Sequence, residues 1–251
     1  MEIREFEQAE EMTRKAAAHI AEIAEKAVEK KGFFTMALAG GNSPRQIYSC
    51  LAEKPLSAKM PWKHTYVFWG DERHIDHTHN DSNYRMAYDT LLSKVEIPPK
   101  NIFRVPVEVK PAETAAALYE RMMIKFFREF RAINRETHFP VFDLIILGVG
   151  TDGHTASLFP GHRAVNEKKK WVMHVKAHAR VTLRERITMT LPLINNAEDI
   201  MFIISGQGKG KVIKQIFSAP PGIKKQYPAA KIGKETQSVW FIDTSIYEEG
   251  L

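Results

Sequence analysis

The sequence lacks three features that are typical of secreted and membrane proteins. It has a single cysteine, Cys50, which cannot form an internal disulfide. No apolar run approaches the roughly 20 residues that span a bilayer. Residues 1–15 are acidic and amphipathic, without the basic and then apolar order of a secretory signal. We therefore expect a cytoplasmic protein with no membrane partner, in which Cys50 is a small core residue.

A recognised nucleic-acid-binding motif is also absent, although the chain has a net charge of +6 and a pI of about 9.2. Such a charge suits nucleic acid, a membrane surface or a small anionic substrate. The basic residues are scattered along the chain, and the longest run, residues 168–170, is typical of a solvated surface. The charge alone does not choose among these partners, but the scattered basic residues and the missing motif predict no nucleic-acid partner.

Strand-like and helix-like segments alternate along the chain. Apolar residues recur at helical spacing from Gln8 to Lys31, with a glycine following where a helix cap belongs. Further helices are predicted over residues 82–93 and 112–130, and buried strands over residues 33–39, 64–69, 142–147, 200–205 and 238–243. This alternation predicts an α/β fold with one domain over residues 1–251, in which helices cover both faces of a mostly parallel sheet.

Four of the predicted strands end in polar loops that contain glycine. These loops are GGNSP at 40–44, GDER at 70–73, GVGTDGH at 148–154 and SGQGKGK at 205–211. In open parallel sheets, ligands bind outside the carboxyl ends of the strands. We therefore expect the four loops to converge on one site.

The third loop carries the G-x-G-x-x-G spacing of dinucleotide-binding proteins, but the features that should accompany it are missing. Pro160-Gly161 arrives too soon for a long helix, and the basic stretch KKKWVMHVKAHAR offers no carboxylate for a ribose. The fourth loop is not a P-loop, since Val212 stands where Ser or Thr must hold magnesium. No G-x-S-x-G elbow supports a serine nucleophile.

Two of these loops are candidates for holding an anion. Successive backbone N–H groups of Gly40, Gly41, Asn42 and Ser43, at the start of a predicted helix, make an anion cradle. The alternative is a tight turn that needs glycine for its dihedral angles. In the fourth loop, Lys209 can reach a phosphate as a point charge.

Two arginines add to the anion-binding candidates. The guanidinium fork of Arg73 suits a phosphate, although Asp71 and Glu72 offer the alternative of an ordinary surface ion pair. Arg186, in RERITMTLP, is open to the same two interpretations.

Asp152 and His154 are the candidates for acid–base chemistry. A histidine can take a proton from water near neutral pH, and a carboxylate can orient it and stabilise its charged form. A lone loop histidine is often only a surface residue, but the neighbouring carboxylate and anion-binding loops favour His154 as a general base.

A metal site is the alternative function for the histidine-rich stretch at 74–81. His74, His77 and His79 could supply nitrogen ligands, together with Asp76 or Asp81. Loop histidines without a visible supporting partner or a C-x-x-C are more often solvated, so we predict no metal at this stretch.

Taken together, these loops resemble those of the 6-phosphogluconolactonase family, whose fold is shared with glucosamine-6-phosphate deaminases. The resemblance runs from about residue 34 to residue 243 and is carried by GGNSP, FWGDER followed by DSNYRMA, LGVGTDGHTASLFPG, RITMTLPLIN and SGQGKGKV. The deaminases typically have D-E-Y in place of this D-E-R, and Asn-Glu-Pro after D-G-H in place of residues 157–160. Asn42 departs from the Ser of many members, and the histidine-rich insert is unusual.

The resemblance implies a sugar-phosphate isomerase-like (modified Rossmann) fold and hydrolysis of 6-phospho-D-glucono-1,5-lactone in the oxidative pentose phosphate pathway, without a cofactor. It implies that His154 is the base and Asp152 its polar partner. Arg73 and Lys209 would hold the phosphate of the sugar lactone, with help from the Gly40–Ser43 backbone and Arg186. The alternatives are a glucosamine-6-phosphate deaminase-like enzyme and a non-catalytic sugar-phosphate sensor.

Overall fold

Six parallel strands form the central sheet of the computed structural model, which describes residues 1–178, 182–218, 220, 222, 226–233 and 237–247. Their order is β1-β9-β8-β5-β2-β3, and every neighbouring pair is parallel. β2 and β5 are buried at every residue, as continuous apolar strands between two helical layers should be. The predicted parallel sheet is thereby confirmed. The strands are β1 (Glu2–Phe6), β2 (Phe34–Leu38), β3 (Thr65–Trp69), β5 (Leu144–Leu147), β8 (Asp199–Ile204) and β9 (Gln237–Asp243).

A second sheet of three antiparallel strands was not predicted. It has the order β4-β7-β6 and consists of β4 (Asp71–Arg73), β6 (Val172–Lys176) and β7 (Glu185–Met189). The sequence predicts a loop at residues 70–73, because three polar residues carry no apolar pattern. Pairing with β7 makes them a strand.

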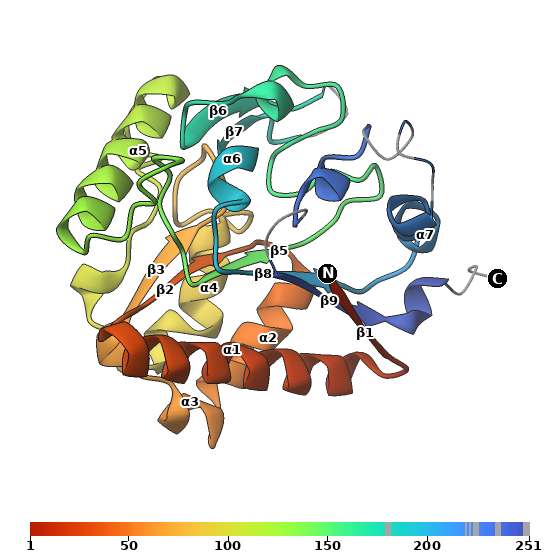
Figure 1. Ribbon diagram of the computed structural model, residues 1–251, viewed down its shortest axis with the longest axis horizontal. Helices are drawn as coiled ribbons and strands as arrows, with labels where there is room; N and C mark the ends of the chain where they lie inside the picture. Colours follow the sequence, from red (N-terminus) through yellow and green to blue (C-terminus); the bar gives the residue numbers. More distant parts are fainter. Residues whose placement is uncertain (179–181, 219, 221, 223–225, 234–236, 248–251) are drawn as a thin grey trace.

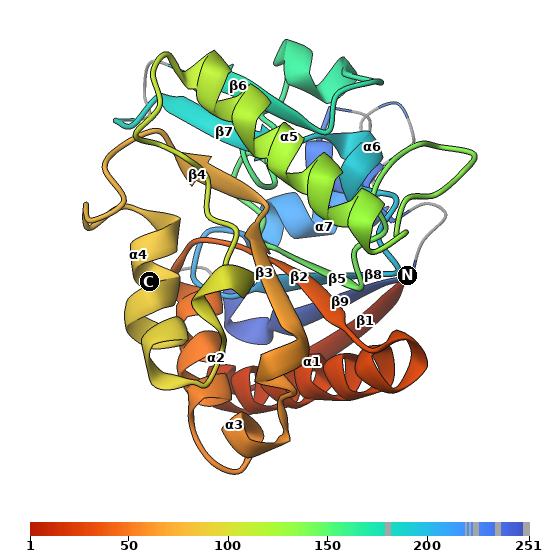
Figure 2. The ribbon, with the colours of Figure 1, turned by 90° about the vertical axis from the view of Figure 1, so that its left-hand side faces the viewer.

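Helices cover both faces of the parallel sheet, as predicted (Figure 1). α1, α2 and α3 lie on one face, and α5, α6 and the small sheet lie on the other. Figure 2 shows α5 running along β6 and β7. The helices are α1 (Ala9–Lys31), α2 (Asn42–Ala52), α3 (Leu56–Lys59), α4 (Asn83–Thr90), α5 (Ala112–Glu129), α6 (Leu191–Ile194) and α7 (Gly210–Ser218). Short 3-10 turns occur at Trp62–His64, Leu92–Lys94, Pro99–Asn101, Arg163–Asn166, Pro228–Lys231 and Thr244–Tyr247.

The strand order reverses direction at β2, which has β3 on one side and β5 on the other. The chain continues from β2 to β3 on one side and from β5 to β8 on the other side. At such a switch point, the loops that follow β2 and β5 diverge and open a crevice at the carboxyl edge of the sheet. A continuous cluster of buried apolar side chains extends from this sheet to β6 and β7. Cys50 packs against this cluster, and burial raises the pKa of its thiol. One domain over residues 1–251 stays a prediction.

Candidate active site

The carboxyl edge of the parallel sheet holds a cavity of about 470 Å³. The loops that follow β2, β3, β5 and β8 contribute to its lining, together with β7 of the small sheet. The expected convergence of the four loops is therefore present. Of the nine candidate residues, only Asp152 is not part of the lining. The other eight are Gly40, Gly41, Asn42, Ser43, Arg73, His154, Arg186 and Lys209.

His154 and Asp152 form a directly bonded pair. The distance between His154 Nδ1 and Asp152 Oδ1 is 2.5 Å, and the same oxygen accepts the His154 backbone N–H at 3.1 Å. Partial burial raises the pKa of Asp152, but the hydrogen bond and charge of His154 outweigh burial, and the net pKa lies below its ordinary value. An ionised carboxylate only accepts hydrogen bonds, so Nδ1 is the donor. The Nε2 lone pair of neutral His154 is then available to take a proton.

Close packing fixes the imidazole of His154. The ring of Phe159 lies 4.9 Å away between centroids. A Cβ at position 150 would lie 2.1 Å from His154 Cε1, so only glycine leaves room for the ring. Gly150 N–H donates to the carbonyl of His154, and this bond closes the loop. The third glycine-containing loop therefore serves to hold a histidine.

Arg73 and Arg186 lie directly opposite each other on β4 and β7. Like charges at paired positions of a sheet destabilise it, so this arrangement favours an anionic ligand between or beside them. Burial lowers the pKa of Arg186, the charge of Asp71 opposes this, and the charge of Arg73 adds to it. Arg186 Nε donates to the carbonyl of Leu183 at 2.6 Å, and among the described residues the outer nitrogens of its fork have no hydrogen-bond partner that would compete with a ligand.

The surface ion pair considered as an alternative for Arg73 is not formed. Within the described ranges, no ion pair joins Arg73 to Asp71 or Glu72. Arg73 donates from Nη1 to the carbonyl of Asp81, and its buried Nε has no partner among the described residues. A buried donor without an acceptor is costly, so a ligand oxygen at this position would be stabilising.

Glu72 has a structural role. Its carboxylate accepts the backbone N–H groups of Arg73, Asn83 and Tyr84 at 2.8 Å and the hydroxyl of Ser82 at 3.0 Å. Burial raises its pKa, and these backbone hydrogen bonds oppose the rise. Glu72 thus binds the first turn of α4 on the side of β4 opposite to Arg73.

Lys209 lies immediately before α7 and lines the cavity. No hydrogen bond or ion pair of its ammonium group exists within the described part of the chain. Burial lowers its pKa. A partly buried cation without a counter-ion is poised to gain from an anionic ligand.

The first turn of α2 also faces the cavity, where Asn42 and Ser43 begin the helix. The first intrahelical bond of the turn runs from Arg45 N–H to Gly41 O, so the N–H groups ahead of it point toward the helix end. Ser43 Oγ lies 2.5 Å from Ser205 Oγ. A Cβ at position 40 would lie 1.9 Å from Asn83 Oδ1, which explains the glycine there.

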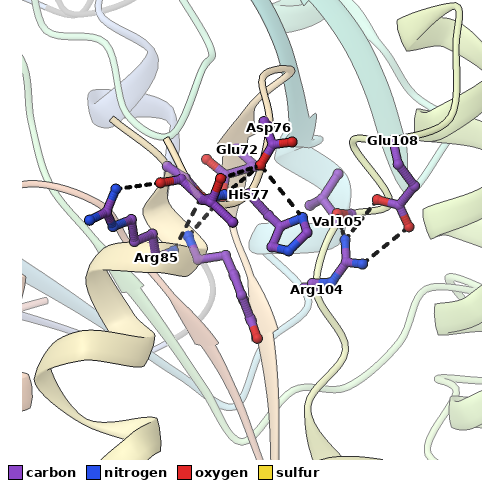
Figure 3. A network of polar contacts seen from close by, with 10 residues as sticks. Glu72, Asp76, His77, Arg85, Arg104, Val105 and Glu108 are labelled. Carbon is purple, nitrogen blue, oxygen red and sulfur yellow. Dashed lines mark hydrogen bonds and ion pairs between the residues drawn. The ribbon is translucent and has the colours of Figure 1, made fainter. Parts of the chain in front are cut away.

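The histidine-rich loop does not gather its three imidazoles. His74 Nε2 is 2.9 Å from the carbonyl of Val109, His77 makes an edge-to-face contact with Tyr84, and His79 Nδ1 accepts the Asp81 backbone N–H at 3.1 Å. Figure 3 shows His77 turned toward Asp76, with Arg85 bonded to the loop and Arg104 paired with Glu108. In the part of the chain that the structure describes, no cluster of three His, Cys, Asp or Glu residues could hold a metal.

Four residues of the site were not assigned a role from the sequence. Asp71, Asn83 and Phe159 line the cavity, and Ser157 donates a hydrogen bond to Asp71 Oδ2 at 2.6 Å. All four belong to the motifs GDER, DSNYRMA and TASLFPG, but their residue types did not indicate which of them touch the cavity. The one available signal was the period-two alternation of a strand, which places Asp71 on the same side as Arg73.

The chain is similar to proteins of known name over nearly its whole length. A family model described as "Glucosamine-6-phosphate isomerases/6-phosphogluconolactonase" matches residues 7–241. A 6-phosphogluconolactonase of Synechocystis sp. is 39% identical over 218 residues, or 87% of this chain and 85% of that protein. The chloroplastic 6-phosphogluconolactonase 3 of Arabidopsis thaliana is 36% identical over 228 residues, or 90% and 68% of the two chains. The crystal structure of 6-phosphogluconolactonase from Thermotoga maritima matches with a TM-score of 0.79 at 28% identity, covering 96% and 98%.

Proposed function

We propose that this chain, which belongs to the glucosamine-6-phosphate isomerase/6-phosphogluconolactonase family, hydrolyses 6-phospho-D-glucono-1,5-lactone to 6-phosphogluconate. Relatives at 36% and 39% identity that are named 6-phosphogluconolactonases support this branch of the family. This reaction belongs to the oxidative pentose phosphate pathway. D-E-R at 71–73 and S-L-F-P at 157–160 also favour the lactonase over the deaminase.

One observation carries the proposal. A single cavity has a carboxylate-bonded histidine in its lining and three cationic side chains without carboxylate partners among the described residues. A phosphorylated lactone has the matching features, an electrophilic carbonyl at C1 and a dianion at C6. Arg73, Arg186 and Lys209 would bind the phosphate, and the first turn of α2 would add backbone N–H groups.

In the proposed reaction, His154 Nε2 removes a proton from a water molecule that attacks the lactone carbonyl. Asp152 orients the ring and stabilises the imidazolium that forms. The C1–O5 bond then breaks as the tetrahedral intermediate collapses, and the imidazolium returns its proton to the ring oxygen. One histidine therefore acts first as a base and then as an acid.

The phosphate contacts also support turnover. Holding the C6 end fixes the carbonyl relative to His154, so the attack takes place within one bound geometry. The developing oxyanion needs donors aimed at it. The N–H of Gly150 is not available for this role, because it is bonded to the carbonyl of His154.

We propose the cytoplasm as the compartment and no nucleic acid as partner. The backbone N–H groups of the three lysines at 168–170 all bind the carboxylate of Glu167, so this basic run forms a compact local turn. A fluorescent fusion would test the compartment, since several plant relatives are named chloroplastic. If excess duplex DNA does not slow lactone hydrolysis, this would support the proposal that the chain has no nucleic-acid partner.

The direct test is a lactonase assay on 6-phosphogluconolactone generated freshly from glucose 6-phosphate, with acid release followed at constant pH. The expected result is a rate that rises in proportion to protein concentration above the spontaneous hydrolysis. Binding of 6-phosphogluconate without acceleration would identify a sensor instead. Release of ammonia from glucosamine 6-phosphate would identify a deaminase.

A further inference from the structure

Asp71 is a buried acid within the cationic cavity that the proposed reaction does not use. It lines the cavity, and its residue is only 9% exposed. No ion pair joins it to an arginine or lysine in the described ranges, although its charge influences the pKa of Arg186. A carboxylate in this position lowers the net positive charge of a phosphate site. Phosphate binding therefore does not account for the presence of Asp71 in the cavity.

The pairing of the small sheet fixes where Asp71 lies. Side chains two residues apart on a strand point to the same side, so Asp71 and Arg73 share one side of β4, about 6.6 Å apart along the strand. On β7, Thr188 is opposite Asp71 and Arg186 is opposite Arg73. Asp71 and Thr188 are therefore the next same-side pair along the two strands from the pair of Arg73 and Arg186.

A hydrogen bond places Asp71 next to the loop of His154. Asp71 Oδ2 accepts the hydroxyl of Ser157 at 2.6 Å, and Ser157 is three residues beyond His154 in the same loop. The Ser157 backbone N–H donates to Thr188 Oγ1 at 3.2 Å, which fastens the loop to β7 as well. Asp71 is thus bonded to the loop that carries His154 and shares a strand with Arg73, one of the proposed phosphate-binding cations.

The second carboxylate oxygen of Asp71 is only weakly engaged. Asn83 Nδ2 is 3.4 Å from Oδ1, while its shorter bond, at 2.9 Å, is to the Asp71 carbonyl. A carboxylate oxygen can accept two hydrogen bonds, so Oδ1 has capacity left. Between the C1 carbonyl and the C6 phosphate, a gluconolactone carries only hydroxyl groups and the ring oxygen. A hydroxyl can donate to Oδ1.

We propose that Asp71 is a specificity-determining residue whose Oδ1 accepts a hydrogen bond from one ring hydroxyl, at C2, C3 or C4, of the bound sugar lactone. This inference rests on the proposed function and deepens it. A site built to bond a hydroxyl discriminates against an analogue that lacks it, because the acceptor is then left buried and unpaired. Asp71 therefore selects for a hydroxylated sugar, and the cations select for its phosphate.

The test compares four substrates: 6-phosphogluconolactone and its 2-deoxy, 3-deoxy and 4-deoxy analogues, each freshly generated. The wild type should lose at least about 10-fold in kcat/KM on one analogue. Asp71→Asn keeps an oxygen for Ser157 but can present an amide donor at the other position. It should lose at least about 10-fold on the parent lactone and use the parent and that analogue within about 3-fold of each other.

Glu72→Gln is the matched control, because this neighbouring buried acid points away from the cavity. It should retain the wild-type ratio between parent and analogue, whatever it does to thermal stability. Asp71→Ala, a second variant, should show the same loss of discrimination as Asp71→Asn, so the test does not depend on one variant folding.

Two outcomes would overturn the role of Asp71 alone. One is a wild type that hydrolyses all three deoxy lactones as well as the parent, which requires no variant at all. The other is a folded Asp71→Asn protein that loses the same factor on all four substrates, as a purely structural residue would. A wild type that accelerates no lactone would refute the proposed function, and the role of Asp71 with it.

Discussion

A buried ion pair at the amino edge of the parallel sheet contrasts with two cations at its carboxyl edge. At the amino edge, Asp143 is 2% exposed and fully bonded: it accepts the N–H and hydroxyl of Thr35, both at 2.8 Å, and pairs with Lys31 at 2.7 Å. At the carboxyl edge, Arg73 and Lys209 are partly buried and have no carboxylate partner among the described residues. Asp143 and Lys31 at the amino edge therefore satisfy each other's charge, whereas Arg73 and Lys209 at the carboxyl edge have no counter-ion among the described residues.

This difference separates charges that hold the fold together from charges that await a ligand. Desolvated charges destabilise a protein unless partners are supplied. For Asp143 at the amino edge, the chain itself supplies these partners, Thr35 and Lys31. At the carboxyl edge a phosphate would supply them, so substitutions at the two edges should change different measurable quantities.

The largest effect is expected from Asp143→Ala at the amino edge. It removes the acceptor of two Thr35 donors and leaves Lys31 unpaired, so the free energy of unfolding should fall by about 3 kcal/mol. Urea denaturation measures this, with Asp143→Asn as the milder control, since it retains an acceptor. A loss below about 1 kcal/mol for Asp143→Ala would show that this edge is not held by its charge.

The next effect is expected from His154→Ala at the carboxyl edge. It removes the proposed base, so kcat on the phosphorylated lactone should fall by roughly 100-fold or more, with little change in stability. His64→Gln, an exposed histidine just before β3 at the amino edge, is the control and should leave kcat unchanged. Turnover of the His154 variant close to that of the wild type, after subtraction of spontaneous hydrolysis, would exclude His154 as the base.

A smaller effect of unusual sign is expected for Lys209→Met. Because burial lowers the pKa of this unpaired cation, removing it should raise the unfolding free energy of the empty protein by roughly 0.5–1 kcal/mol. The same variant should gain less thermal stability than the wild type when 6-phosphogluconate is added. A destabilised empty variant would mean that Lys209 supports the fold.

The smallest effect concerns the pH dependence of stability. The folded-state pKa of Asp152 is lowered, so its contribution is present above its unfolded pKa and is lost as pH falls through the folded value. Because the side chain is 47% exposed, this contribution should be about 0.5 kcal/mol or less. The unfolding free energies of the wild type and of Asp152→Asn should differ at pH 6 and should become equal as the pH falls below about 4. A difference that grows on acidification would contradict this sign.

The sequence predicted those elements whose own apolar pattern is sufficient. α1, α5, β2 and β5 all begin and end within two residues of the predicted ranges, because each buries a continuous stripe or run. β1, β4 and β7 were not predicted. β1 is a largely exposed edge strand, and β4 is three polar residues that become a strand only by pairing with β7, far along the chain.

The candidate site divides in the same way. The convergence of Gly40–Ser43, His154 and Lys209 follows from the rule that parallel strands present their carboxyl ends together. The partners of Arg73 could not be predicted, because two adjacent acids offered an ion pair that β4 does not form. Glu72 is turned to the opposite side to cap α4, and Asp71 is bonded to Ser157. Both arrangements depend on segments that meet only in the folded chain.

The most direct test of the contrast between the two edges measures kcat/KM on 6-phosphogluconolactone and on unphosphorylated gluconolactone. Arg73→Ala and Lys209→Met should lower the preference for the phosphorylated substrate by roughly 10- to 100-fold each. Lys31→Met, the cation of the amino edge, should lower stability and leave the preference unchanged. Equal losses of the Arg73 and Lys209 variants on both substrates would contradict the assignment of the unpaired cations to phosphate.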